Sequence, residues 1–120
     1  MNAELGPAKR EELPQLVALL GMLFSQEAEF VPDDAKQARA LGKILADETV
    51  GRIYVAREGA RVVAMASLLY SVSTAAGGLA AFFEDLIVLP DRRGRGIASA
   101  LLRFIVEEAR KAGVPAGWLR

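Results

Sequence analysis

Residues 84–102, EDLIVLPDRRGRGIASALL, combine a short apolar run, a proline, three arginines and two glycines. The apolar run ends at Pro90, a residue that cannot donate a ladder hydrogen bond and therefore favours the end of a strand. From Gly96 onward, apolar residues recur at helical spacing: Ile97, Ala98, Leu101, Leu102, Ile105, Val106 and Ala109. The stretch predicts a strand over residues 80–89, a turn over 90–95 and a helix from about 96.

The predicted turn has the features of an anion-binding site. Backbone N–H groups at a helix N-terminus lack intrahelical partners and carry the positive end of the helix dipole. Gly94 and Gly96 let the backbone bend and let a bulky anion approach without meeting a Cβ atom. Arg92, Arg93 and Arg95 add positive charge that suits a diphosphate. A bound polyanion would reverse the cost of about 0.3–1 kcal/mol that each exposed cation has at a helix N-terminus.

Two other interpretations of this turn are a solvated basic loop and a nucleic-acid contact. An RNA contact is disfavoured because no aromatic residues interleave with the arginines, and because 15 basic residues balance 15 acidic ones in the chain. A Walker phosphate loop is absent, since no Gly-Lys-Ser/Thr follows the turn, and GRGIAS departs from the dinucleotide fingerprint G-x-G-x-x-G.

The rest of the chain predicts a mixture of helices and strands. Helical periodicity extends over residues 11–30, and a second helix follows the PDD sequence and runs to about residue 46. Two strands, RIYVARE and RVVAMASLLYSV, flank a turn at Glu58–Gly59–Ala60, and a short strand is expected near residues 3–5. This order predicts an α+β (mixed α/β) fold, a largely antiparallel sheet flanked by helices, in one domain spanning residues 1–120.

Composition narrows the chemistry. The 120 residues are 52% hydrophobic and include neither cysteine nor histidine, which excludes disulfides, a cysteine nucleophile and Ser–His catalysis and removes the usual zinc ligands, so no metal is expected. The charged N-terminus lacks the apolar segment of a signal peptide, and no apolar run approaches the roughly 20 residues of a membrane span. We therefore expect a cytoplasmic protein with neither nucleic-acid nor membrane partners.

The sequence Arg93-Gly94-Arg95-Gly96-Ile97-Ala98 resembles the R/Q-x-x-G-x-G/A signature of the GNAT superfamily of acyl-CoA-dependent N-acetyltransferases. The surrounding residues resemble the diamine (spermidine/spermine-type) acetyltransferase branch in particular, where a Glu-Asp pair opens the same strand. The resemblance implies a GNAT-like fold, acetyl-CoA as co-substrate and direct acetyl transfer to a primary amine of a small molecule, polyamine-like or otherwise cationic.

The resemblance also implies roles for individual residues. The backbone of Leu86, Ile87 and Val88 would hydrogen-bond the pantetheine arm of the cofactor as an added strand does. The pyrophosphate would be held by the backbone amides from the turn into the helix, with the Arg93 side chain alongside; these residues are Gly94, Arg95, Gly96, Ile97, Ala98 and Ser99. Arg92 and Arg95 occupy variable positions of the signature, so a role of their side chains in binding phosphate is inferred from charge alone.

Glu84 and Asp85 are the candidate catalytic residues. They interrupt an otherwise apolar strand, and on an extended chain they would point to opposite faces. An amine with a pKa near 10 is mostly protonated at neutral pH, so acetyl transfer benefits from a base. By resemblance, Glu84 is that base, acting through water, and Asp85 helps to bind the cationic substrate. The backbone N–H of Ile87 or Val88 is the expected oxyanion donor. The alternative is that both carboxylates only solvate an exposed start of the strand.

Further expectations concern the acceptor site and the end of the chain. Glu27, Glu29, Asp33 and Asp34 would form an acidic rim between the first two helices, or else an ordinary solvated loop. The family fold continues into a further strand, a helix and a final hairpin, so the chain is expected to be C-terminally shortened. That segment normally supplies a tyrosine acid, and Tyr54 and Tyr70 stand at unmatched positions. Apolar surface left by the shortening would stay exposed or be covered by a homodimer, and the rival function is a non-catalytic CoA-binding or dimerisation module.

Overall fold

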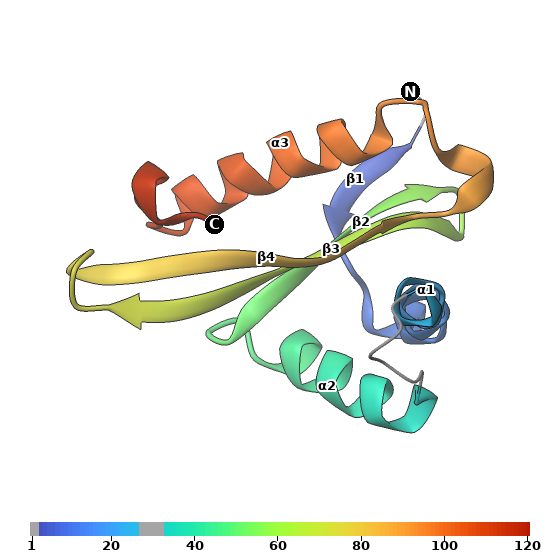
Figure 1. Ribbon diagram of the computed structural model, residues 1–120, viewed down its shortest axis with the longest axis horizontal. Coiled ribbons are helices and arrows are strands. Elements are labelled where there is room, and N and C mark those ends of the chain that lie inside the picture. The colour runs from blue at the N-terminus through green and yellow to red at the C-terminus, as the bar shows by residue number, and fades with distance from the viewer. Residues whose placement is uncertain (1–2, 27–32) are drawn as a thin grey trace.

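Four antiparallel strands form one twisted sheet in the order β1–β2–β3–β4 (Figure 1). The computed structural model describes residues 3–26 and 33–120. The strands are β1 (Glu4–Pro7), β2 (Gly51–Glu58), β3 (Arg61–Ser73) and β4 (Gly78–Val88). The helices are α1 (Leu13–Ser25), α2 (Asp34–Ala46) and α3 (Ile97–Lys111), with short 3-10 turns η1 (Arg10–Glu12), η2 (Pro90–Arg92) and η3 (Ala116–Trp118). The predicted α+β class and antiparallel sheet are confirmed.

Helices cover both faces of the sheet, α3 on one side and α1 with α2 on the other (Figure 1). Two apolar cores result. The core beneath α3 joins Leu101 and Ile105 to Leu68 of β3. The core beneath α1 and α2 joins Leu16 and Leu41 to strand residues that include Ile53, Met65 and Ile87. Apolar side chains therefore alternate between two buried faces along the central strands, as expected for a sheet covered on both sides.

The first two helices begin where their sequences predict. Pro14 occupies the first turn of α1, where its missing N–H leaves no helical hydrogen bond unmade. Asp33 caps α2: its Oδ1 accepts a hydrogen bond from the backbone N–H of Lys36 at 3.1 Å. The helix predicted over residues 11–30 ends at Ser25, and Glu27 and Glu29 of the predicted acidic rim lie outside the described residues.

A β-bulge interrupts the pairing of β3 with β4. Ser67 pairs with Glu84, and Met65 pairs with Ile87. Between these two pairs β4 has two residues, Asp85 and Leu86, where β3 has one. The extra residue is at Asp85, whose φ of 56° places it in the left-handed region that non-glycine residues rarely adopt. The expectation of a regularly extended chain through Glu84 and Asp85 is therefore wrong. An Asp tolerates this conformation better than most residues, because its short side chain can hydrogen-bond locally.

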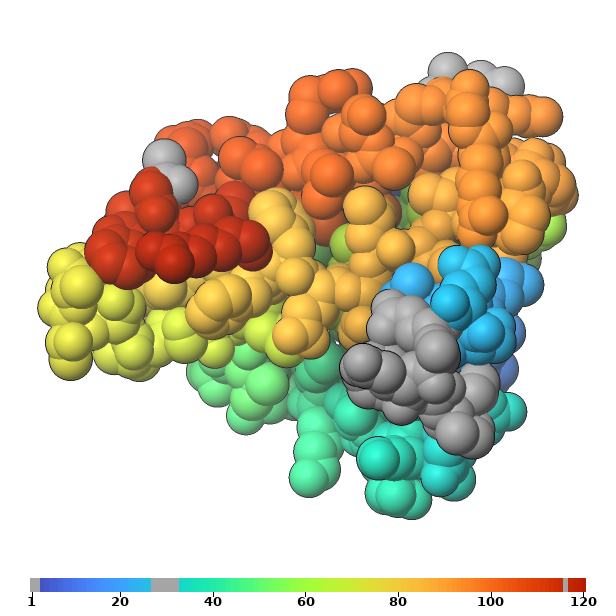
Figure 2. Space-filling view, in the orientation of Figure 1, coloured from blue at the N-terminus to red at the C-terminus, as the bar shows by residue number. Residues whose placement is uncertain are grey.

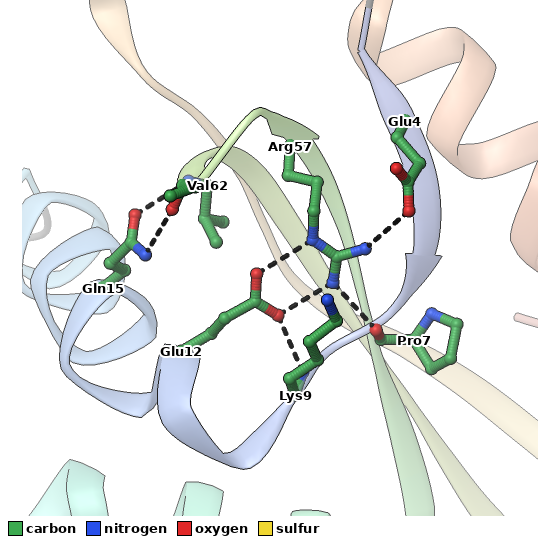
Figure 3. Close-up of polar contacts among 8 residues, drawn as sticks. Glu4, Pro7, Lys9, Glu12, Gln15, Arg57 and Val62 are labelled. Atoms are coloured by element: carbon green, nitrogen blue, oxygen red, sulfur yellow. Dashed lines mark hydrogen bonds and ion pairs between the residues drawn. The ribbon is translucent and has the colours of Figure 1, made fainter.

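A buried ion pair fastens the N-terminal segment to the sheet (Figure 3). Arg57 donates hydrogen bonds from Nε and Nη2 to the two carboxylate oxygens of Glu12, at 2.9 and 2.8 Å. Nη2 of Arg57 also donates to the carbonyl oxygen of Pro7 at 3.0 Å, and the N–H of Lys9 donates to Glu12 at 2.7 Å. Beside this group, Gln15 of α1 accepts from the N–H of Val62 at 2.7 Å. These contacts fix where α1 begins relative to β2 and β3.

Candidate functional site

The turn between β4 and α3 has the backbone conformation that an anion site requires. Gly94 and Gly96 adopt φ angles of 77° and 79°, a region that strongly favours glycine. Gly96 is the N-cap of α3 and provides no side-chain hydrogen bond to the first helical turn. The first-turn amides of α3, at Ile97, Ala98 and Ser99, are therefore not capped by an N-cap side chain and suit a phosphate.

The three arginines of this turn have different environments. Arg92 pairs with Glu58 of β2 at 3.0 Å and with Asp91 at 3.3 Å, so its charge is already balanced by protein carboxylates. Arg93 is exposed and donates from Nε to the carbonyl oxygen of Val88 at 3.0 Å, which links the turn to the end of β4. Arg95 is exposed and forms no ion pair within residues 3–26 and 33–120. Arg93 and Arg95 are thus the two arginines that supply unbalanced charge beside the amides.

A second arginine–carboxylate contact joins this turn to the β2–β3 hairpin. Arg61 of β3 donates two hydrogen bonds to Asp91, at 3.1 and 3.2 Å. The guanidinium of Arg61 lowers the pKa of Asp91 because it hydrogen-bonds the charged carboxylate. Together with the Arg92–Glu58 pair, this contact attaches the glycine turn to the β2–β3 hairpin.

An open groove of about 570 Å³ runs along β4 towards α3. Its apolar residues are Phe83 and Leu86 from β4 and Leu102 and Val106 from α3. Leu86 is 36% exposed and Val106 is 47% exposed, although the sequence places Val106 on the apolar face of its helix. Since β4 is an edge strand of the described sheet, its backbone beside Leu86 is open to pairing with an extended ligand.

A separate pocket of about 360 Å³ lies on the other side of β4, between the strand and the helices α1 and α2. Most of its wall is apolar, formed by Leu20, Phe24, Ala40, Leu41, Ile44 and Leu69. Its polar residues are Glu84 and Asp85 from β4 and Lys36 and Gln37 from the first turn of α2. The pocket has the size and mainly apolar lining of a small-molecule site.

Glu84 and Asp85 line both the groove and the pocket. The bulge lies directly after Glu84, so the regular alternation of strand side chains does not hold at Asp85. Glu84 is exposed and Asp85 half-buried. In Figure 2 the side chains of β4, coloured yellow to gold, reach the surface between α3 and the side of the molecule that carries α1 and α2. A ligand in the groove and a ligand in the pocket would meet at these two carboxylates.

The three residues after the bulge have different surroundings. Ile87 is buried in the core beneath α1 and α2, Leu86 lines the groove, and Val88 packs against the core beneath α3. The backbone of Ile87 pairs with Met65 of β3, so Leu86 and the backbone N–H of Val88 are the candidates for contact with a ligand in the groove.

Neither tyrosine lines the groove or the pocket. Tyr54 is 3% exposed and packs edge-on against Phe104 of α3, with ring centroids 5.7 Å apart. Burial raises the pKa of Tyr54 to about 12, and it also raises the pKa of Tyr70. Both side chains therefore remain protonated well above neutral pH, and Tyr54 belongs to the core rather than to the site.

Sequence reasoning missed Lys36 and Gln37, and it assigned Asp33 and Asp34 to an acidic rim. In the structure Asp33 is the cap of α2, and the two residues after Ala35 line the pocket. The only sequence signal for these two residues is the PDD sequence, which predicts an N-cap and therefore places Lys36 and Gln37 in the first turn of a helix. It does not predict that this turn lines a pocket.

Two classes of feature are not found in residues 3–26 and 33–120. No group of three or more His, Cys, Asp or Glu side chains is arranged to hold a metal ion. Among the same residues, no helix has both the length and the apolar character needed to cross a bilayer.

Comparison with known proteins identifies the family of this chain. The profile of the acetyltransferase (GNAT) family matches residues 15–119. This chain belongs to the GNAT family of acetyltransferases, and membership makes it an acyl-CoA-dependent N-acetyltransferase with acetyl-CoA as its co-substrate. No curated protein matches the chain.

Solved structures agree with this assignment. An integron cassette protein from the mobile metagenome of Cole Harbour Salt Marsh is 31% identical, with a TM-score of 0.85 over 92% of this chain and 72% of that one. A predicted acetyltransferase from Clostridium acetobutylicum, solved with acetyl-CoA, is 18% identical, with a TM-score of 0.80 over 98% of this chain and 79% of that one. Glucosamine-6-phosphate N-acetyltransferase from Arabidopsis thaliana is 18% identical, with a TM-score of 0.75 over 95% and 78% of the two chains. The last two similarities concern the fold alone.

Proposed function

We propose that this acetyltransferase acts on a primary amine of a small cationic molecule, which is either polyamine-like or another cationic amine. The observation that carries the proposal is the position of Glu84 and Asp85, which line both the groove beside α3 and the pocket beside α1 and α2. Two carboxylates at the junction favour a positively charged acceptor over a neutral or anionic one.

The residues present fit acetyl-CoA. The uncapped amides of Ile97, Ala98 and Ser99 suit its pyrophosphate, as does the backbone at Gly94 and Gly96. The exposed guanidinium groups of Arg93 and Arg95 add the positive charge that a diphosphate needs. The apolar groove and the outer edge of β4 at Leu86 and Val88 suit the pantetheine arm, whereas the backbone of the intervening Ile87 pairs with Met65 of β3. When bound, acetyl-CoA supplies an activated acetyl thioester.

The protein's own groups supply binding and proton transfer. Asp85 attracts the acceptor's ammonium group into the pocket, and Glu84 receives the proton that makes the amine nucleophilic, through a water molecule at its exposed carboxylate. The backbone N–H of Val88 donates a hydrogen bond to the oxygen on which negative charge develops, because the N–H of Ile87 faces β3 in the sheet. Direct transfer is favoured because the composition includes no cysteine that could carry the acetyl group.

Release of free thiol from acetyl-CoA, measured against a panel of amines, tests the proposal. The panel should contain polyamines, monoamines and, as a comparison, amino acids and amino sugars. We expect release with cationic amines and little with acceptors that carry a carboxylate or phosphate. Exclusive activity on anionic acceptors would overturn the substrate class, and tight binding of acetyl-CoA without turnover of any amine would favour a non-catalytic binding module.

A further inference from the structure

Gln37 is a buried polar residue in the wall of the acceptor pocket. It lies in the first turn of α2, is 9% exposed and lines the same pocket as Glu84 and Asp85. Among residues 3–26 and 33–120, its Oε1 atom is buried and has no hydrogen-bond partner. A buried polar atom without a partner costs free energy, so its retention in a protein calls for a physical reason.

The backbone around Gln37 is held firmly. The backbone N–H of Gln37 donates to the carbonyl oxygen of Asp33 at 3.0 Å. The side chain of Asp33 accepts a hydrogen bond from the backbone N–H of the neighbouring Lys36. The side chain of Gln37 therefore starts from a fixed point at the helix start. Its terminal amide offers an acceptor and two donors, and rotation about the last torsion can present either to the pocket.

We propose that Gln37 is a specificity-determining residue that hydrogen-bonds a second, neutral polar group of the acceptor amine. The inference rests on the proposed function and narrows its substrate class from polyamine-like and other cationic amines to monoamines that carry a neutral polar group. The acceptor's amine lies at Glu84 and Asp85, its carbon chain lies against the apolar wall, and a hydroxyl or amide group at its other end meets Gln37. Lys36 lines the pocket beside Gln37, and its positive charge disfavours a second ammonium group at that end.

Matched amines test this assignment. Butylamine, aminobutanol and diaminobutane, and the corresponding pentyl and hexyl series, keep the amine and chain constant while the far group changes. For the wild type, we expect kcat/KM for the best amino alcohol to exceed that for the matching alkylamine by about ten-fold, since an unpaired site group rejects the analogue that lacks its partner. A diamine preferred over the amino alcohol would contradict the neutral character of the second group.

Replacing Gln37 with a side chain of similar shape isolates its contribution. We expect Gln37→Met to lower kcat/KM for the amino alcohol about ten-fold through KM, and to leave the alkylamine within about two-fold. The preference should therefore disappear. An unchanged preference in Gln37→Met would overturn the inference while leaving the proposed function intact, whereas no thiol release from the wild type with any amine would contradict both.

Thermal unfolding of the unliganded protein distinguishes a binding role from a structural one. A binding group without a partner should not stabilise the fold, so we expect Gln37→Met to leave Tm unchanged or to raise it by about 2–5 °C. A fall of more than about 4 °C would show that Gln37 supports the fold and would overturn the inference. Ser67→Ala is the matched control, because Ser67 is 1% exposed, also has a buried unpartnered atom among the described residues, and does not line the pocket. The control should keep the preference for the amino alcohol.

Discussion

Glu12 and Arg57 meet in the interior of the protein although 45 positions separate them in the sequence. Their contact is bidentate, with Nε–Oε2 and Nη2–Oε1 distances of 2.9 and 2.8 Å, and both residues are 6% exposed. Neither residue was identified by sequence reasoning, because nothing in the two local sequences indicates that they pair. The pair joins the segment before α1 to β2, and α1 forms one wall of the acceptor pocket.

Removal of one partner of this pair should be strongly destabilising. We expect Arg57→Met to lower the free energy of unfolding by about 3–5 kcal/mol, because it leaves the carboxylate of Glu12 buried without its cation. Chemical denaturation measures the change. Glu12→Gln is the comparison, because Arg57 then keeps one acceptor oxygen at this position, the carboxylate of Glu4 at 3.3 Å and the carbonyl oxygen of Pro7 at 3.0 Å. We expect a smaller loss, and a loss as large as that of Arg57→Met would contradict this explanation.

The same pair predicts how stability depends on pH. Hydrogen bonds from Arg57 lower the pKa of Glu12 below its ordinary value of 4.5, so the folded state binds its proton less readily than the unfolded state does. This contribution is complete above pH 4.5 and is lost as the pH falls through the lower folded-state pKa. The free energy of unfolding of Glu12→Gln should therefore fall less steeply in acid than that of the wild type. Parallel profiles would show that other carboxylates control acid unfolding.

Gly96 tests the phosphate site. In Gly96→Val, we expect the affinity for acetyl-CoA to fall about ten-fold or more, because a side chain there obstructs approach to the amides and strains a backbone with a φ of 79°. Calorimetric titration measures the affinity. Gly59→Val is the matched control, since Gly59 has a φ of 61° in the β2–β3 turn. The control should be destabilised to a similar degree and should bind acetyl-CoA as the wild type does.

The arginines of the glycine turn should separate into two groups. Arg93→Ala should weaken acetyl-CoA binding about ten-fold, the usual scale for one charge-assisted hydrogen bond. Arg92→Ala should leave the affinity within about two-fold of wild type and lower stability by up to about 1 kcal/mol, because Arg92 already pairs with Glu58 and Asp91. Equal losses of affinity in the two variants would contradict this division.

Glu84→Gln tests the base. We expect kcat to fall about 100-fold or more with little change in KM, since a positioned base contributes on that scale to proton transfer. The loss should be greatest at low pH, where the smallest fraction of the amine is neutral. Asp85→Asn should instead raise KM for cationic amines, and Asn tolerates the left-handed backbone at this position. Activity of Glu84→Gln equal to wild type across the pH range would remove Glu84 as the base.

The sequence predicted the elements well, because local signals determine them. The periodicity of α3, the glycine turn and the strand before it are all encoded within residues 84–112, and the structure reproduces them closely. The same periodicity grouped Leu102 and Val106 with the buried face of the helix, whereas both line the groove. Periodicity identifies the apolar face of a helix, but it does not distinguish residues that pack in the core from residues that line an open groove.

Features that depend on long-range pairing could not be predicted. The bulge at Asp85 arises from the pairing of β3 with β4, and neither strand alone reveals it. Likewise, Gln37 lines the pocket only because α2 packs beside α1 and β2. The expectation of an extended chain through Glu84 and Asp85 followed from strand geometry, and it is wrong where the bulge interrupts that geometry.

The bulge has a consequence for how β4 is composed. On one side of Asp85, Glu84 stands beside Ser67, and on the other side Ile87 packs with Met65, so both flanks satisfy the alternation that the sheet requires. A strand one residue shorter at this point would still satisfy it. The sheet therefore does not need Asp85 for its pairing. We infer that Asp85 has a role in the reaction, at the point where the groove and the pocket meet.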